Sequence, residues 1–107
     1  MHTPAEFRRS FRQGRRHSDA YFTVYAVATG APARLGMAVA KKAVPAAANR
    51  NRIKRVIRES FRLTRSGLPP LDLVVQAKPA AGLADNPALR QSLARHWQEW
   101  IEPCAAS

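Results

Sequence analysis

The chain contains a segment that is both basic and amphipathic, Asn49-Arg-Asn-Arg-Ile-Lys-Arg-Val-Ile-Arg-Glu-Ser-Phe-Arg62. Its apolar residues recur at helical spacing, and we expect them to form one buried stripe: Ile53, Val56, Ile57 and Phe61. Its polar residues also recur at helical spacing and are expected to form an exposed stripe: Asn51, Lys54, Arg55, Arg58 and Arg62. An arginine guanidinium offers a planar fork of donors that fits two phosphate oxygens at once. The segment therefore predicts a helix that packs on a core and presents cations to a polyanion, for which nucleic acid is the default.

Length and charge narrow the class of protein. The chain has 107 residues, and we expect residues 1–107 to form a single domain with a modest core. The net charge is +11, and residues 41–65 hold nine of the 18 basic residues but a single acid, Glu59. Five more arginines lie in residues 1–16. Binding to a polyanion should therefore weaken steeply with salt, because counterions are released.

The composition also argues against several classes. No apolar run approaches the ~20 residues of a membrane span, so no membrane partner is expected. No apolar stretch follows the N-terminal arginines, which argues against a secretory signal. Cys104 is the single cysteine, so an intramolecular disulfide or a thiolate metal cluster is impossible, and a cytoplasmic location is expected.

The sequence contains no recognisable catalytic or metal-binding constellation. His2, His17 and His96 are scattered without the spacing of a metal site or a catalytic pair, and we expect each to be exposed or locally hydrogen-bonded. Neither a Ser-His-Asp set nor paired carboxylates is present. We therefore predict no catalytic residue and no metal ligand in the protein itself.

The remaining elements follow from periodicity and turn residues. Helices are predicted over residues 5–13, from Pro45 to about Ser66, and from Asn86 onwards with Asn86 as N-cap. Strands are predicted over residues 20–28, 34–40 and 71–77, with a further short strand around 15–18. The first two of these strands are expected to pair as a hairpin. The order α-β-β-α-β-α predicts an α+β sandwich of a small mixed sheet and helices.

Two sets of aromatic residues have a predicted position. In the strand at 20–28, Tyr21 and Tyr25 face one side, whereas Phe22 and Val24 face the core. Trp97 and Trp100 lie on the apolar stripe of the last helix and are expected to pack in the core.

Several motifs together resemble the protein subunit of bacterial ribonuclease P. The strand and lysine pair Arg34-Leu-Gly-Met-Ala-Val-Ala-Lys-Lys42 is followed by Arg50-Asn-Arg-Ile-Lys-Arg55 and Arg58-Glu-Ser-Phe-Arg62. Upstream, the matching residues are Phe7, Phe11 and Gly14-Arg15, and downstream they are Asp72-Leu-Val-Val and Ala77-Lys-Pro. The resemblance covers roughly residues 6–101, and the ordered set is far more specific than a lone Arg-Asn-Arg.

The resemblance implies a fold and a role. The fold is of the split β-α-β type, with a left-handed crossover that departs from the usual right-handed rule. The role is that of a small partner of a catalytic RNA, which removes the 5′ leader from precursor tRNA with magnesium ions bound at the RNA active site. The protein alone is expected to bind no cofactor, and its partners are the ribonuclease P RNA and the single-stranded leader of precursor tRNA.

The resemblance also assigns site residues. The surface for the RNA subunit consists of Arg50, Asn51, Arg52, Lys54, Arg55 and Arg58, with Lys41 and Lys42 just before it. The leader-binding set consists of Phe7, Phe11 and Tyr25, with Tyr21 as a secondary candidate and with Arg8, Arg12 and Arg15 among the flanking arginines. Aromatic rings stack on any base, which suits leaders of varied sequence. Phe7 and Phe11 also fit an ordinary core stripe, and Lys41 and Lys42 also fit an ordinary charged turn.

The alternative function is that of a ribosomal or ribosome-assembly protein, because small basic α+β chains are common there. Such a protein would need one RNA surface. A basic helix together with a separate aromatic set favours a protein that joins a substrate to a catalytic RNA.

Overall fold

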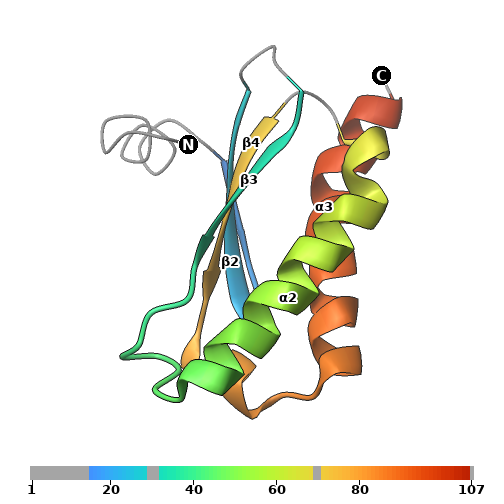
Figure 1. The fold of residues 1–107 in the computed structure, drawn as a ribbon. Helices are drawn as coiled ribbons and strands as arrows, with labels where there is room; N and C mark the ends of the chain where they lie inside the picture. The colour runs from blue at the N-terminus through green and yellow to red at the C-terminus, as the bar shows by residue number, and fades with distance from the viewer. Residues whose placement is uncertain (1–14, 29–31, 69–70, 107) are drawn as a thin grey trace.

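The computed structural model describes residues 15–28, 32–68 and 71–106 (Figure 1). The helix predicted over residues 5–13 lies outside this part of the chain. The described elements are β1 (Arg15–Ser18), β2 (Phe22–Ala28), β3 (Arg34–Ala38), α2 (Ala47–Thr64), the 3₁₀ turn Arg65–Gly67, β4 (Leu71–Ala77), the 3₁₀ turn Pro79–Leu83 and α3 (Asn86–Ala106). The predicted strands and the two later helices are thus confirmed, including the short strand β1.

The sheet is mixed and has the strand order β1-β2-β4-β3. β2 pairs antiparallel with β1 and with β4, whereas β3 pairs parallel with β4. The predicted hairpin between β2 and β3 is therefore wrong, because β4 lies between them. The reason is in β4 itself, where every residue except Gln76 is buried. A continuous apolar run of this kind is typical of a strand covered on both faces, and such a strand takes the centre of the sheet.

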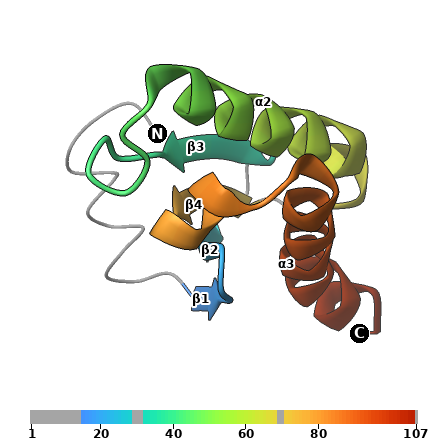
Figure 2. The same ribbon diagram turned by 90° about the horizontal axis from the view of Figure 1, so that it is seen from below.

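The connection from β3 to β4 runs through α2. β3 and β4 both run downwards in Figure 1, and α2 returns upwards on the face of the sheet that α3 also covers. The views in Figures 1 and 2 together show a left-handed crossover. The structure thus confirms the unusual hand implied by the resemblance, against the strong right-handed preference of such units.

The two faces of the sheet differ in character. Residues paired across strands share a face, so the pair Val24 and Val75 and the pair Tyr25 and Val74 lie on opposite sides. Phe22, Val24 and their neighbours on the first side are buried against α2 and α3. The other side carries Tyr25, as the alternation in the sequence predicted.

The two helices complete the core. The four apolar residues of the predicted α2 stripe are all buried, and α3 contributes Leu89, Leu93, Trp97 and Trp100. The Phe61 and Trp97 rings meet edge to face at 6.0 Å between centroids, and the Trp97 Nε1–H donates to Ser60 Oγ at 2.8 Å. The core role predicted for both tryptophans is confirmed.

The start of α3 differs from the prediction in its capping residue. The backbone N–H of Ala88 donates to Asp85 Oδ1 at 2.9 Å, and the Leu89 N–H donates to the Asp85 carbonyl at 3.1 Å. Asp85 is therefore the N-cap, and Asn86 is the first residue of the helix. The Asn86 side chain is not available for capping because its Oδ1 accepts a hydrogen bond from Arg52 Nη1 at 2.7 Å.

No helix in the described ranges is long and apolar enough to cross a membrane.

Candidate nucleic-acid interface

The exposed side of α2 carries a row of cations. Since Ile53, Val56, Ile57 and Phe61 hold the helix on the core, the opposite side faces solvent. We call this side the basic stripe: Asn51, Lys54, Arg55, Arg58 and Arg62. All of its members are exposed except Lys54, which is half-buried. Glu59 is the only acid of the helix and lies 3.8 Å from Arg62, and the first turn carries no acid that would offset the positive end of the helix dipole.

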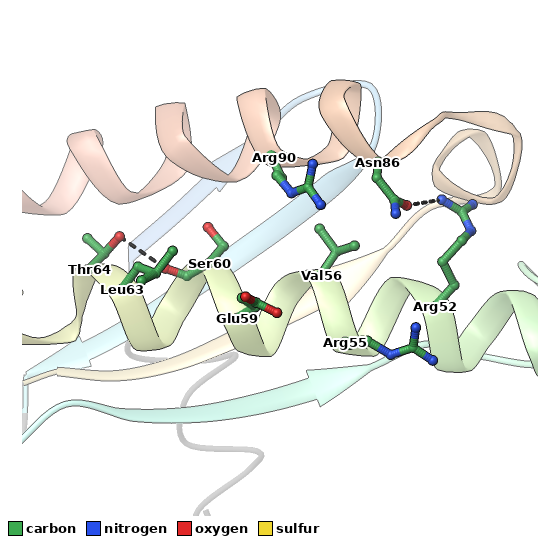
Figure 3. Close-up of a pocket in the computed structure, with 9 residues that line it drawn as sticks. All are labelled: Arg52, Arg55, Val56, Glu59, Ser60, Leu63, Thr64, Asn86 and Arg90. Carbon is green, nitrogen blue, oxygen red and sulfur yellow. Dashed lines mark hydrogen bonds between the residues drawn. The ribbon is translucent and has the colours of Figure 1, made fainter.

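Arg50 and Arg52 differ from the basic stripe because they also bind the protein. Arg50 Nη1 donates to the carbonyls of Val44 at 3.0 Å and Pro45 at 2.7 Å, which fastens the loop before the helix. Arg52 donates through Nε to Asn49 Oδ1 at 2.9 Å and through Nη1 to Asn86 Oδ1 (Figure 3). These bonds fix the direction of both guanidinium groups. Any phosphate they bind therefore meets donors that are already oriented.

The lysine pair precedes this helix. Lys41 and Lys42 are exposed in a turn closed by hydrogen bonds from the Ala43 and Val44 N–H groups to the Ala40 carbonyl, at 3.1 and 2.9 Å. The turn leads directly to the start of α2, so the two ammonium groups extend the positive surface at that end.

The opposite side of the sheet carries Tyr25. Its ring is half-buried, and its hydroxyl donates to Gln76 Oε1 at 3.4 Å. Arg16 is its direct cross-strand neighbour on β1, and Arg34 lies on the same side of β3. We call this surface the tyrosine face. It combines one aromatic ring with the exposed guanidinium group of Arg16 beside it, a pattern that suits single-stranded nucleic acid.

The structure brings only part of the predicted leader set to the tyrosine face. Arg15 points to the other side, where its guanidinium carbon lies 5.4 Å from the centroid of the Trp100 ring. Arg16 takes the position beside Tyr25, as expected from the alternation of a strand. Tyr21 packs partly against the core. The other predicted members, Phe7, Arg8, Phe11 and Arg12, lie outside the described residues.

An ion pair on the tyrosine face could not be found from the sequence. Arg34 donates to both carboxylate oxygens of Asp72, at 2.8 Å from Nε and 2.6 Å from Nη2. Asp72 is buried, and the two residues are partners in the parallel register of β3 and β4. Thirty-eight positions separate them in the chain, so only the pairing of the strands reveals the contact.

Comparison with known proteins identifies the family. The family model Ribonuclease P matches residues 1–100. The ribonuclease P protein component of Thioalkalivibrio sulfidiphilus is 43% identical over 103 residues, which cover 95% of this chain and 86% of that protein. That of Pasteurella multocida is 45% identical over 100 residues, covering 92% and 84%. The chain belongs to the ribonuclease P protein family.

Solved structures agree with this assignment. The ribonuclease P protein of Staphylococcus aureus superposes with a TM-score of 0.83 at 31% identity, covering 92% of this chain and 91% of that one. The protein from Thermotoga maritima gives 0.82 at 27% identity, covering 92% and 96%. Membership in the ribonuclease P family confirms the resemblance and the α+β fold. It gives this chain a role in tRNA processing with the ribonuclease P RNA and a tRNA substrate, and it does not support the ribosomal alternative.

The histidines correct a further prediction, since two of them lie together. His17 Nδ1 on β1 lies 2.6 Å from His96 Nδ1 on α3, so one of the two nitrogens carries the shared proton. His96 is fully buried, and its Nε2 lies 3.3 Å from Asp19 Oδ2. Ser92 donates to the same carboxylate oxygen. These contacts fasten the edge strand β1 to α3, an arrangement for which the sequence spacing gave no signal.

The charge states within this cluster follow from its surroundings. Burial by itself raises the pKa of Asp19, but hydrogen bonds from the Ser92 hydroxyl and from the Phe22 and Tyr21 N–H groups outweigh it and lower that pKa to about 2. Burial lowers the pKa of His96 below its usual value, although the Asp19 carboxylate acts in the opposite direction. Among the described residues, no group of three or more His, Cys, Asp or Glu side chains could hold a metal ion.

Proposed function

We propose that this chain binds the catalytic RNA of ribonuclease P through the basic stripe and binds the 5′ leader of precursor tRNA on the tyrosine face. The observation that supports this most strongly is the position of the two surfaces. α2 packs on one side of the sheet with the basic stripe turned outwards, whereas Tyr25 lies on the other side. Such a protein can contact two RNA strands at once without competition between them.

Each surface has the chemistry of its proposed partner. Guanidinium groups in a row on a rigid helix fit the phosphates of a folded RNA, and Arg50, Lys41 and Lys42 extend this row towards the helix start. A tyrosine ring stacks on a base without reading its identity, so the tyrosine face suits leaders of different sequence. Arg16 would neutralise a leader phosphate beside the ring, whereas the charge of Arg34 is offset by its ion pair with Asp72.

The hydrolytic step itself is proposed to belong to the RNA subunit. Magnesium ions held by the RNA would activate water and stabilise the charge that develops on the phosphate. The protein would contribute affinity for the leader and neutralise charge between RNA strands. This division of labour would operate in the cytoplasm, where bacterial tRNA is transcribed.

Cleavage of a precursor tRNA at low magnesium concentration tests this function. The RNA subunit is assayed alone, with the wild-type protein, and with the Arg55→Ala/Arg58→Ala variant. We expect strong stimulation by the wild type and a loss of stimulation in the variant, since each phosphate contact contributes about 1 kcal/mol or more.

Two further variants serve as controls. Arg55→Lys/Arg58→Lys keeps the charge but not the planar fork and should stimulate to an intermediate degree. Arg95→Ala removes one charge from α3, on the side that faces Asp19, and should stimulate like the wild type. A wild-type protein that binds the RNA subunit but never stimulates cleavage would contradict the proposal.

A further inference from the structure

A groove lies between α2 and α3, next to the basic stripe. It has a volume of about 400 Å³, within the range of roughly 300–1,000 Å³ found for small-ligand sites. One end is cationic, with Arg52 and Arg55 from α2 and Arg90 from α3. Figure 3 shows Arg52 turned towards Asn86 and Arg90 reaching from α3 towards Val56, whereas Arg55 lies on the side of α2 that faces away from α3. The rest of the groove is walled mainly by the apolar groups of Val56 and Leu63.

The cationic end is preorganised. Arg52 is held by two asparagines, and one of these, Asn49, donates in turn to the Gly82 carbonyl at 2.8 Å. The Arg52 Nη2 makes no hydrogen bond within the described ranges, so both of its N–H groups remain for a ligand. Arg55 and Arg90 are exposed and likewise make no hydrogen bond or ion pair to the described residues. Arg52 and Arg90 therefore offer donors from two helices on the side of α2 that faces α3, and Arg55 offers further donors at the outer border of the groove.

The apolar end is unusual for a surface. Leu63 is 71% exposed and is one of two large hydrophobic side chains that are exposed in the described part of the chain. Beside it, Ser60 Oγ accepts the Trp97 Nε1–H, which leaves the Ser60 hydroxyl proton to be donated into the groove. Glu59, the one carboxylate of the lining, lies 3.8 Å from Arg62. This end offers an apolar surface with one donor and one acceptor at its border.

We propose that this groove binds one unpaired nucleotide of the RNA subunit, with its phosphate between Arg52 and Arg90, with Arg55 at the outer border, and with its base against Val56 and Leu63. The proposal rests on the function proposed above, since Arg55 belongs both to the basic stripe and to the groove. An RNA strand that lies along the stripe therefore continues into the groove. A paired base cannot bind in this way, because its faces are covered by its stacked neighbours.

The charge part of the proposal is tested by the affinity of the protein for the ribonuclease P RNA at several salt concentrations. Arg90→Ala should weaken binding by about fivefold or more and reduce the slope of log K against log salt by about 0.7, as for one phosphate contact on a single strand. Arg95→Ala is the matched control, because it removes the same charge from the same helix but faces Asp19. It should leave both the affinity and the slope close to wild type.

The base part is tested by photo-crosslinking within the assembled holoenzyme. A p-benzoylphenylalanine in place of Leu63 should crosslink to one nucleotide that is unpaired in the RNA subunit, and primer extension identifies it. The same residue in place of Gln98, which is exposed near His17 and Asp19, should not crosslink to that nucleotide. A crosslink spread over paired regions, or none, would overturn the proposal.

The variants give different results when the groove is wrongly assigned and when the proposed function is wrong. If only the inference is wrong, Arg90→Ala behaves like the wild type while Arg55→Ala/Arg58→Ala still loses RNA affinity. If the proposed function is wrong, neither variant changes the stimulation of cleavage. Circular dichroism of each variant verifies that lost binding does not reflect an unfolded protein.

Discussion

Asn49 shows how one side chain can connect the fold to the candidate RNA surface. Its amide donates to the Gly82 carbonyl at 2.8 Å and accepts from Arg52 Nε at 2.9 Å. A Cβ atom added at Gly82 would lie 3.3 Å from Asn49 Nδ2, so the loop before α3 approaches the helix closely here. Asn49 therefore holds Arg52 in place and joins the start of α2 to the start of α3.

Replacing Asn49 should thus lower stability as well as RNA binding. Asn49→Ala removes two hydrogen bonds and is expected to reduce the free energy of unfolding by about 1–2 kcal/mol, measured by urea denaturation. Asn51→Ala is the matched control, since it makes the same change in the same helix at an exposed position. It should change stability by no more than about 0.5 kcal/mol. Equal effects of the two variants would show that the Asn49 contacts do not stabilise the fold.

The buried His96 should make stability depend on pH. Its pKa is lowered in the folded protein, so below pH ~6.5 the unfolded chain binds a proton that the folded chain does not. Stability should therefore fall as the pH drops from 7.5 to 5, while Asp19, with a pKa of about 2, stays ionised. The other charged or titratable groups around this cluster are His17, Arg95 and Glu99.

The test compares the free energy of unfolding of the wild type and of His96→Gln at pH 7.5 and pH 5. The variant should be less stable at pH 7.5 but should lose less stability on acidification. An unchanged pH dependence in the variant would mean that His96 does not cause it.

Helices and strands were predictable in this chain to the extent that each carries its own signal. The α2 segment has a clear apolar period, and β4 is a compact apolar run, so both lie where the sequence placed them. No local signal in the sequence tells which strands lie next to each other in the sheet. The most apolar strand gains most from burial at the centre of the sheet. For this reason β4 lies beside β2, where the sequence had predicted β3. The sides of the sheet to which Arg15 and Arg16 point depend likewise on how β1 pairs with β2.

The contact between α2 and α3 allows the packing of the two helices to be tested. Trp97→Phe keeps an aromatic ring beside Phe61 but removes the hydrogen bond to Ser60, and should cost about 1 kcal/mol beyond the lost ring area. Trp100→Phe is the comparison, because Trp100 Nε1 is buried without a hydrogen-bond partner among the described residues. Thermal unfolding of both variants measures the difference. A Trp100→Phe variant as destabilised as Trp97→Phe would contradict the role of the Ser60 bond.

The proposed function places the two RNA contacts on opposite sides of the whole molecule. The sheet and its two covering helices form a slab, with the basic stripe and the groove on the helical side and the tyrosine face on the other. The sequence predicted the two surfaces through the motifs that it shares with the ribonuclease P family. It could not predict the groove, because Arg90 and Arg52 are far apart in the chain and meet only through the packing of α3 on α2.

Binding of precursor tRNA to the holoenzyme, compared with binding of mature tRNA, tests whether the two surfaces are separate. With Tyr25→Ala, the affinity for the precursor should fall by ~1–3 kcal/mol, roughly 5- to 150-fold, while the affinity for mature tRNA stays the same. Tyr25→Phe should bind like the wild type, since the ring is retained. Arg55→Ala/Arg58→Ala, added in excess so that the holoenzyme forms, should keep the preference for the leader. Equal losses for precursor and mature tRNA in Tyr25→Ala, or no loss at all, would contradict the assignment of the leader to the tyrosine face.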